Sequence, residues 1–175
     1  MLGGQFSARL NMNLREDKHW AYGAYSFMFD AKGQRPFLAF SPVQTDKTAP
    51  AMGEIARELK EIVGKRPPTQ AELDRVVKNN VNSLPGHYET LGAVMQSLQS
   101  SLVYGRPWNY PTTLAPDYQA LTPKALGDEA KALVFPEQLV WVVVGDLSKI
   151  EAPVRALKLG EVEVRELDDG KQAKR

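Results

Sequence analysis

The chain has 175 residues, 43% of them hydrophobic and 25% charged, which is typical of a globular protein with one adequate core. Its 22 basic and 21 acidic residues give a net charge of +1, so no uniform field attracts nucleic acid or an anionic membrane. There is no cysteine, which excludes disulfides, thiol nucleophiles and cysteine metal sites. The longest apolar run, residues 139–144, is far shorter than the roughly 20 residues that span a bilayer, and we expect neither nucleic acid nor a membrane as a partner.

The amino-terminal segment predicts a short amphipathic helix. Apolar side chains recur at every fourth position, at Phe6, Leu10 and Leu14, and this spacing places them on one helical face. The helix is expected to run from Phe6 to about Glu16. Arg15 then lies in the last turn, where a cation interacts favourably with the negative end of the helix dipole.

A β-hairpin is predicted next. Residues 22–29 alternate between two faces, which is typical of a strand, and Tyr22 is expected to open it. Residues 30–33 carry aspartate and glycine at the first and fourth positions of a turn, so the chain is expected to reverse into a second strand over residues 36–43. The hydroxyl of Tyr22 would then be fixed on a rigid sheet.

Capping residues and apolar spacing predict a series of helices in the middle of the chain. Residues 69–72 and 148–151 each have the spacing of a capping box, and Pro153 makes the last helix short or late to begin. The aromatic loop 104–111 leaves two interpretations open: a shelf for a bound peptide, or packing onto the sheet or a neighbouring domain, which is the commoner arrangement. The predicted helices run from Asp46 or Thr48 to Gly64, from Thr69 to Pro85, over residues 91–104, from Thr122 to Phe135, and from Ser148.

Two further strands complete the predicted sheet. Residues 139–144 are apolar and rich in β-branched side chains, which indicates a central, buried strand. Residues 161–167 alternate charged and apolar side chains, as an exposed edge strand does. These elements predict an α+β fold of two layers, a mostly antiparallel sheet with the helices packed on one face. The single domain is expected to cover residues 1–167, followed by a polar, disordered tail over residues 168–175.

The block around Arg15 resembles one peptidase family. The motif S-x-R-L, followed by L-R-E and, five positions later, by A-Y, is similar to the carboxy-terminal, non-metal domain of the M16 zinc peptidases, the insulinase, pitrilysin and mitochondrial processing peptidase group. The resemblance covers roughly residues 2–167 and implies the M16, or LuxS-MPP-like metallohydrolase, fold, apparently truncated at its amino end. The motif residues are Ser7, Arg9, Leu10, Leu14, Arg15, Glu16, Ala21 and Tyr22.

In this family the matching arginine and tyrosine contact the substrate beside a zinc ion that the other half carries. The resemblance therefore implies that Arg15 and Tyr22 are catalytic residues, which hold the scissile carbonyl and stabilise the oxyanion, since a guanidinium and a phenol are both hydrogen-bond donors. A purely structural role is the alternative, because an arginine suits a helix end and a tyrosine suits a strand. Their occurrence together in one block favours function.

The residues needed for a catalytic metal are missing. The family's zinc site uses an H-x-x-E-H motif on a helix and a distal glutamate, whereas this chain has only His19 and His87, far apart and each without a partner histidine. We predict no metal and no cofactor in this chain, with zinc in a partner domain or subunit. The isolated chain is expected to be inactive, so its status as an enzyme depends on that partner within a zinc metalloendopeptidase system.

The resemblance also implies partners. In relatives the motif lies well inside a domain, so we interpret the chain as the carboxy-terminal piece of a longer polypeptide. We expect it to close over an extended peptide substrate together with a zinc-bearing M16 half; the alternative is a non-catalytic scaffold or partner subunit that only binds protein. The unpaired sheet edge left by truncation predicts a homo-oligomer. By analogy with relatives, the expected location is periplasmic, with cytoplasmic or mitochondrial as the alternatives.

Overall fold

The computed structural model describes residues 1–165, in which helices predominate around one small sheet. No helix within this range is long and apolar enough to cross a membrane. The elements are, in chain order, α1 (Arg9–Asn11), the π-helix η1 (Met12–Asp17), β1 (Tyr25–Met28), β2 (Phe37–Phe40), the 3₁₀-helix η2 (Thr45–Lys47), α2 (Thr48–Ile62), α3 (Gln70–Ser83), the 3₁₀-helix η3 (Pro85–Tyr88), α4 (Leu91–Tyr104), α5 (Tyr110–Gln119), α6 (Pro123–Leu133) and α7 (Leu147–Ala156).

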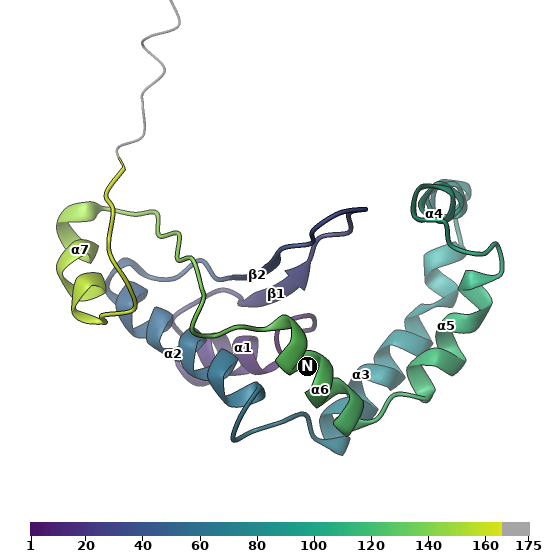
Figure 1. The fold of residues 1–175 in the computed structure, drawn as a ribbon, viewed down its shortest axis with the longest axis horizontal. Helices are drawn as coiled ribbons and strands as arrows, with labels where there is room; N and C mark the ends of the chain where they lie inside the picture. The colour runs from purple at the N-terminus through teal and green to yellow at the C-terminus, as the bar shows by residue number, and fades with distance from the viewer. Residues whose placement is uncertain (166–175) are drawn as a thin grey trace, which may run out of the picture.

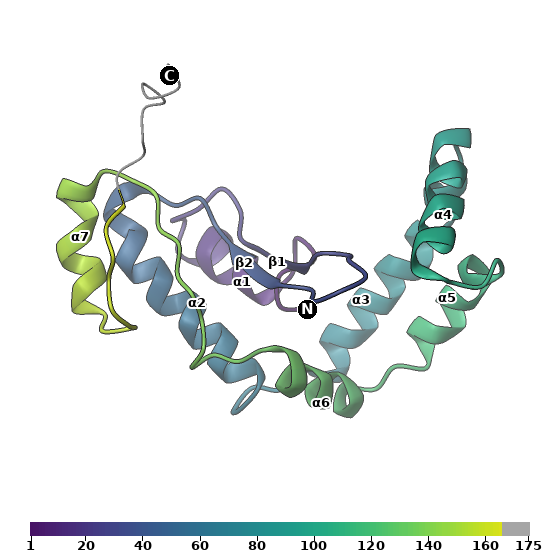
Figure 2. The ribbon, with the colours of Figure 1, turned by 45° about the horizontal axis from the view of Figure 1, so that its top comes forward.

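The molecule has a body and an arm. Figure 1 shows that the body holds α1, α2, α7 and the β1–β2 hairpin, whereas α3, α4 and α5 form the arm, with α6 lying between the two parts. Figure 2 shows the same arrangement from a second direction, with α7 and α4 at opposite ends of the molecule. The elements that carry the predicted site therefore belong to the body.

The buried core lies where α1, α2 and the hairpin meet. Leu10 and Leu14 are almost fully buried, as their four-residue spacing predicts, and they pack against the apolar face of α2. Burial of each such side chain contributes about 1.5–3 kcal/mol to folding. The core cluster consists of Leu10, Leu14, Ala24, Ala51, Ile55, Leu59 and Val134.

The predicted hairpin is confirmed, although both strands are shorter than expected. β1 and β2 pair antiparallel, with Tyr25 opposite Phe40 and Met28 opposite Phe37. α1 and α2 lie on one face of the hairpin (Figure 1). Because residues directly opposite each other in a strand pair share a face, the other face presents four exposed apolar side chains: Tyr25, Phe27, Leu38 and Phe40.

The predicted helix boundaries hold over most of the chain, and their capping chemistry explains why. Thr69 and Glu72 form the expected capping box at the start of α3, and Gly105 ends α4 with a positive φ of 65°, a conformation that glycine adopts without strain. The predicted capping box at Ser148 is wrong, because α7 begins one residue earlier and the side chain of Asp146 accepts from the N–H of Ser148.

The prediction of a central buried strand over residues 139–144 is wrong. Leu139 and Trp141 pack against the core, but Val140, Val142 and Val144 are 90%, 84% and 81% exposed. The apolar, β-branched sequence does favour an extended backbone, yet no other segment of residues 1–165 pairs with it. The described sheet therefore has two strands only.

Two further differences concern the second half of the chain. Residues 161–165 form no edge strand, and residues 166–167 of that predicted strand lie outside the described residues, together with the predicted tail over residues 168–175. Helix α5 was not predicted, because Pro107 and Pro111 indicate a loop. Pro111 sits in the first helical turn, where the missing N–H costs nothing because it would have no partner within the helix.

Candidate functional site

The predicted first helix is in part a π-helix. It begins at Arg9, not at Phe6, and after three residues it widens into η1. Within η1 the N–H of Lys18 donates to the carbonyl of Asn13, at 3.1 Å, five residues back, whereas an α-helix bonds four residues back. Arg15 lies inside this widened stretch, a type of distortion that is frequent at functional sites.

The prediction that Tyr22 opens the strand is also wrong. The N–H of Ala24 donates to the side-chain oxygen of Asn11, at 3.2 Å, so this part of the chain bonds to the helix and the strand begins only after it. The backbone beside Tyr22 is nevertheless held, because Ala21 forms an isolated antiparallel bridge with Val43. The side chain of Tyr22 is 84% exposed, so it stands on an anchored loop at the surface.

The structure brings Arg15 and Tyr22 together. The guanidinium carbon of Arg15 lies 5.1 Å from the ring centroid of Tyr22 and 4.8 Å from that of Phe6, which are cation–π distances. Its Nε atom also lies 3.2 Å from a carboxylate oxygen of Glu16. The aromatic rings contact the guanidinium through their faces, and guanidinium donors point outward in the plane of the group. Among the described residues, neither the Nη atoms of Arg15 nor the hydroxyl of Tyr22 has a hydrogen-bond partner.

His19 supports the backbone of this site. It has a positive φ of 56°, and its ring Nδ1 lies 3.0 Å from the carbonyl oxygen of Arg15. A carbonyl can only accept, so Nδ1 carries the proton and donates. The side-chain amide of Gln44 donates in turn to the carbonyl of His19, at 3.2 Å. The histidine thereby fastens the loop between Arg15 and Tyr22.

The described residues do not fit a catalytic zinc ion. Within residues 1–165, no three histidine, cysteine, aspartate or glutamate side chains gather in a group that could hold a metal. His19 follows η1 in the body, whereas His87 lies in η3 beyond the end of α3. A zinc-dependent step therefore needs ligands from another polypeptide segment.

A second arginine of the same block has a structural function. Arg9 forms a two-pronged ion pair with Glu72, at 2.6 and 2.7 Å, and it also donates to the carbonyls of Arg66 and Pro67. Glu72 meanwhile accepts from the backbone N–H of Thr69, at 2.9 Å. The hydrogen bond from Arg9 is the main cause that lowers the pKa of Glu72 to about 2. This cluster joins α1, the α2–α3 loop and α3.

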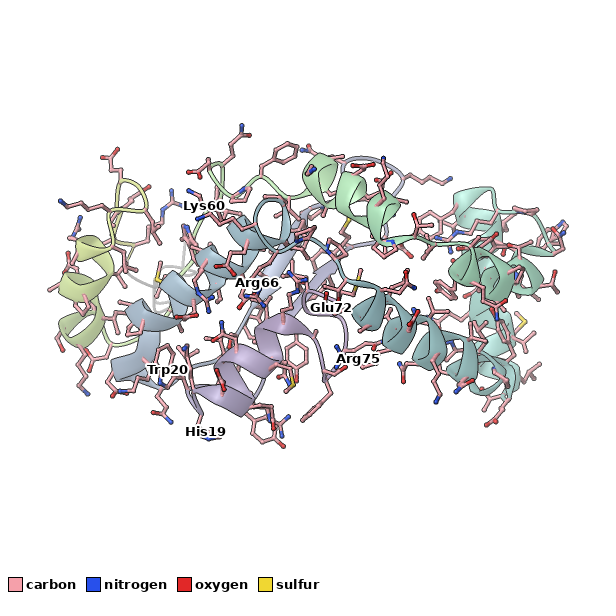
Figure 3. The ribbon with its side chains drawn as sticks, turned by 90° about the horizontal axis from the view of Figure 1, so that it is seen from below. His19, Trp20, Lys60, Arg66, Glu72 and Arg75 are labelled. Carbon is pink, nitrogen blue, oxygen red and sulfur yellow. The ribbon has the colours of Figure 1, made fainter. Side chains whose placement is uncertain are left out.

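The two arginines therefore face different surroundings. Figure 3 shows Arg66 and Glu72 at the junction of α2 and α3, whereas His19 and Trp20 lie at the far end of the first helix. Sequence reasoning singled out Arg15 but assigned no structural function to Arg9, and it did not identify Phe6 as a partner of Arg15. Arg9 belongs to the S-x-R-L motif and Phe6 directly precedes it, so the motif was the available signal for both residues.

The aromatic loop after α4 packs around an arginine. The guanidinium of Arg106 lies 4.9 Å and 5.0 Å from the ring centroids of Tyr104 and Tyr110, and it is 3.7 Å from a carboxylate oxygen of Asp30 in the hairpin turn. Of the three aromatic side chains, Trp108 remains largely exposed. Two of the rings thus serve a contact between the arm and the hairpin, as the packing interpretation expects.

Comparisons with known proteins agree on one class. Residues 1–80 match the family described as the peptidase M16 inactive domain. The fold resembles that of a peptidase M16 inactive domain from Pseudomonas fluorescens, with a TM-score of 0.70 and 22% identity over 77% of this chain and 32% of that chain. The resemblance to M16 peptidase domains found in the Arg15–Tyr22 block is confirmed over residues 1–80, which match the inactive-domain family, and the fold is similar to that of such a domain.

Two relatives come from Helicobacter pylori. One is the non-peptidase homolog YmxG, 25% identical over 149 residues, which are 85% of this chain and 34% of that protein. The other is a solved structure described as a protease, with a TM-score of 0.66 and 24% identity over 74% of this chain and 31% of that chain. The chain spans about a third of the length of these relatives.

Proposed function

We propose that this chain is the zinc-free part of an M16 metallopeptidase system that closes over an extended peptide and supplies Arg15 and Tyr22 near the scissile carbonyl. The zinc ion and its general base come from another domain or subunit. One observation carries this proposal: the guanidinium of Arg15 lies 5.1 Å from the ring of Tyr22, and both side chains reach solvent.

The chemistry follows from the donors that this pair leaves unused. When water attacks a peptide carbonyl, negative charge develops on the carbonyl oxygen, and donors placed around that oxygen lower the barrier. The Nη atoms of Arg15 and the hydroxyl of Tyr22 are such donors. Removal of one oxyanion donor typically lowers kcat by about 10²–10³, which sets the scale of the expected effect.

The test combines the purified chain with a zinc-bearing M16 half and an extended fluorogenic peptide. Tyr22→Phe removes only the hydroxyl, so we expect kcat to fall by roughly a hundredfold while KM changes little. Tyr88→Phe is the matched control, because it removes a tyrosine hydroxyl in η3, outside the site. An unchanged kcat in Tyr22→Phe would refute the catalytic role of the pair.

A second function, a non-catalytic scaffold that only binds protein, is favoured by one specific finding. The relative from Helicobacter pylori that matches 85% of this chain is named a non-peptidase homolog. On this alternative, the complex with the zinc-bearing half binds the peptide but never cleaves it. Binding followed by anisotropy, alongside cleavage followed by mass spectrometry, separates the two functions in a single sample.

A further inference from the structure

The ring of Phe6 contacts the guanidinium of Arg15 from outside the first helix. Phe6 precedes α1, whereas Arg15 lies in η1. The guanidinium carbon of Arg15 lies over the ring of Phe6, at 4.8 Å from its centroid, which is slightly shorter than the 5.1 Å to the ring of Tyr22. Both rings meet the guanidinium through their faces and leave the donors in its plane free.

Packing in the core does not explain the place of this ring. Phe6 is 58% exposed, and within residues 1–165 it belongs neither to the core cluster nor to the partly buried residues packed against that cluster. The side chain of Arg15, by contrast, is only 33% exposed. A long arginine side chain samples many rotamers in water, and aromatic faces on its guanidinium restrict them.

A buried asparagine holds the backbone from which each ring extends. Asn11 is 2% exposed. Its Nδ2 donates to the carbonyl of Phe6, at 2.7 Å, and its Oδ1 accepts from the N–H of Ala24, at 3.2 Å. A carbonyl can only accept and an N–H can only donate, so these partners determine the orientation of the amide. Ala24 closely follows Tyr22, and one side chain thus fixes both segments that carry the rings around Arg15.

We propose that Phe6 is a positioning residue for Arg15 and that Asn11 holds Phe6 in place. The rings of Phe6 and Tyr22 together restrict the guanidinium, so that its unused Nη donors are directed at one point. This inference rests on the function proposed above, since that point is the scissile carbonyl of the peptide. Phe6 acts through Arg15 and not on the substrate.

The first test uses the peptidase assay with the zinc-bearing half. Phe6→Leu keeps an apolar side chain but removes the ring, and we expect kcat to fall roughly 10- to 100-fold with little change in KM, because a displacement of about 1 Å can cost a hundredfold. Phe6→Tyr keeps the ring face and should restore most of the kcat that Phe6→Leu loses. Phe135→Leu is the matched control, because Phe135 is 54% exposed and lies after α6.

The second test follows the order of the Arg15 Nε–H group by ¹⁵N relaxation in the chain alone. We expect it to be ordered in the parent and mobile in Phe6→Leu, while the contact of Nε with Glu16 is present in both. Asn11→Ser keeps the ring but is too short to reach both Phe6 and Ala24, and it should mobilise Arg15 as well. The double variant should be no worse than either single variant, since both act on one contact.

A second variant guards against unfolding of Asn11→Ser. Asn11→Asp keeps the acceptor for Ala24 and loses the donor to the carbonyl of Phe6, so it should also mobilise Arg15. Far-UV circular dichroism verifies that each variant folds. A folded Asn11 variant in which Arg15 stays as ordered as in the parent would overturn the role of Asn11.

The two tests separate this inference from the proposed function. The relaxation measurement needs neither zinc nor peptide, so an equally ordered Arg15 in the parent and in Phe6→Leu overturns the positioning role whatever the activity. A parent-like kcat in Phe6→Leu overturns it as well when Tyr22→Phe is impaired in the same assay. If Tyr22→Phe is fully active, the proposed function fails, and the relaxation measurement alone decides whether Phe6 positions Arg15.

Discussion

The guanidinium of Arg15 lies 5.1 Å from the ring of Tyr22, although the two residues are seven positions apart and neither belongs to a regular strand. The contact arises because the π-helix ends just after Arg15 and the Ala21–Val43 bridge returns the chain toward it. The pair is thus held by the backbone on both sides. Neither side chain belongs to the core, so replacement of either residue should change the stability of the fold only slightly.

Replacement of the two arginines of this block should lower stability by unequal amounts. Arg15→Ala is expected to lower the free energy of unfolding by less than about 1 kcal/mol, because its aromatic and ionic contacts are exposed. Arg9→Ala should cost roughly 3 kcal/mol, because it leaves the carboxylate of Glu72 without its ion-pair partner. Urea unfolding measures both values, and equal losses would contradict the assignment of separate roles.

Arg9→Lys provides the control for that comparison. Lysine keeps the positive charge but cannot reproduce the two-pronged contact with Glu72 and the bonds to two carbonyls. We expect an intermediate loss of stability, and a complete rescue would mean that charge alone matters.

Stability should fall at acid pH partly through Glu72. The pKa of this carboxyl is lowered from an ordinary 4.5 to about 2, chiefly by the hydrogen bond from Arg9. A group with a lowered pKa in the folded state contributes stability above its unfolded pKa and loses that contribution as the pH falls. The loss is therefore expected between about pH 4.5 and 2.

Glu72→Gln isolates that contribution. The variant should be less stable than the parent at neutral pH by roughly 2 kcal/mol, because it loses a charge-assisted bond. It should show a flatter dependence of unfolding free energy on pH below 4.5, as measured by urea unfolding at several pH values. Parallel pH profiles for parent and variant would contradict the lowered pKa.

Asn13→Asp should destabilise the body. The side-chain amide of Asn13 donates to carboxylate oxygens of Glu54 and Glu58, at 2.8 and 2.9 Å, and Glu58 is buried. Aspartate in place of this donor sets three carboxylates together, so we expect a loss of roughly 2 kcal/mol or more at neutral pH. The loss relative to the parent should shrink near pH 4, where carboxylates protonate; thermal unfolding at both pH values checks this. Asn13→Ala, which adds no charge, should show no such pH dependence.

The alternation along residues 139–144 predicts unequal effects of truncation. Trp141→Ala should cost roughly 2 kcal/mol, since that large side chain is partly buried and packs against the core. Val142→Ala should change stability by less than about 0.5 kcal/mol at a concentration where the chain is monomeric, because the side chain faces solvent. The comparison is made by urea unfolding of both variants, and similar losses would show that both faces are buried.

Local signals in the sequence were sufficient for most helices. The Thr69–Glu72 box, the Thr122 cap and Gly105 act on backbone groups within a few residues, so their consequences do not depend on distant partners. The reversal between β1 and β2 was predicted as well, although residues 29–36 form a longer connection than the expected four-residue turn. The pairing of Arg15 with Tyr22 followed from a family motif, not from any local rule.

The wrong predictions concern features that depend on contacts with distant segments of the chain. An apolar run such as residues 139–144 indicates an extended chain but not its neighbour, and no described residue supplies one. Helix α5 was missed because the prolines near its start indicate a loop, whereas its packing against α3 is a tertiary contact that the local sequence does not reveal. The bond from Ala24 to Asn11 that delays β1 is a contact between segments, which spacing alone does not reveal.

The wide turn of η1 also has a consequence for variation in this protein. Each residue added to or removed from a helix rotates everything beyond it by about 100°. Deletion of Met12 or Asn13 would therefore rotate Arg15 relative to the ring of Tyr22, and it would rotate the buried core residue Leu14 with it. The length of this turn thus couples the position of Arg15 to the packing of the core.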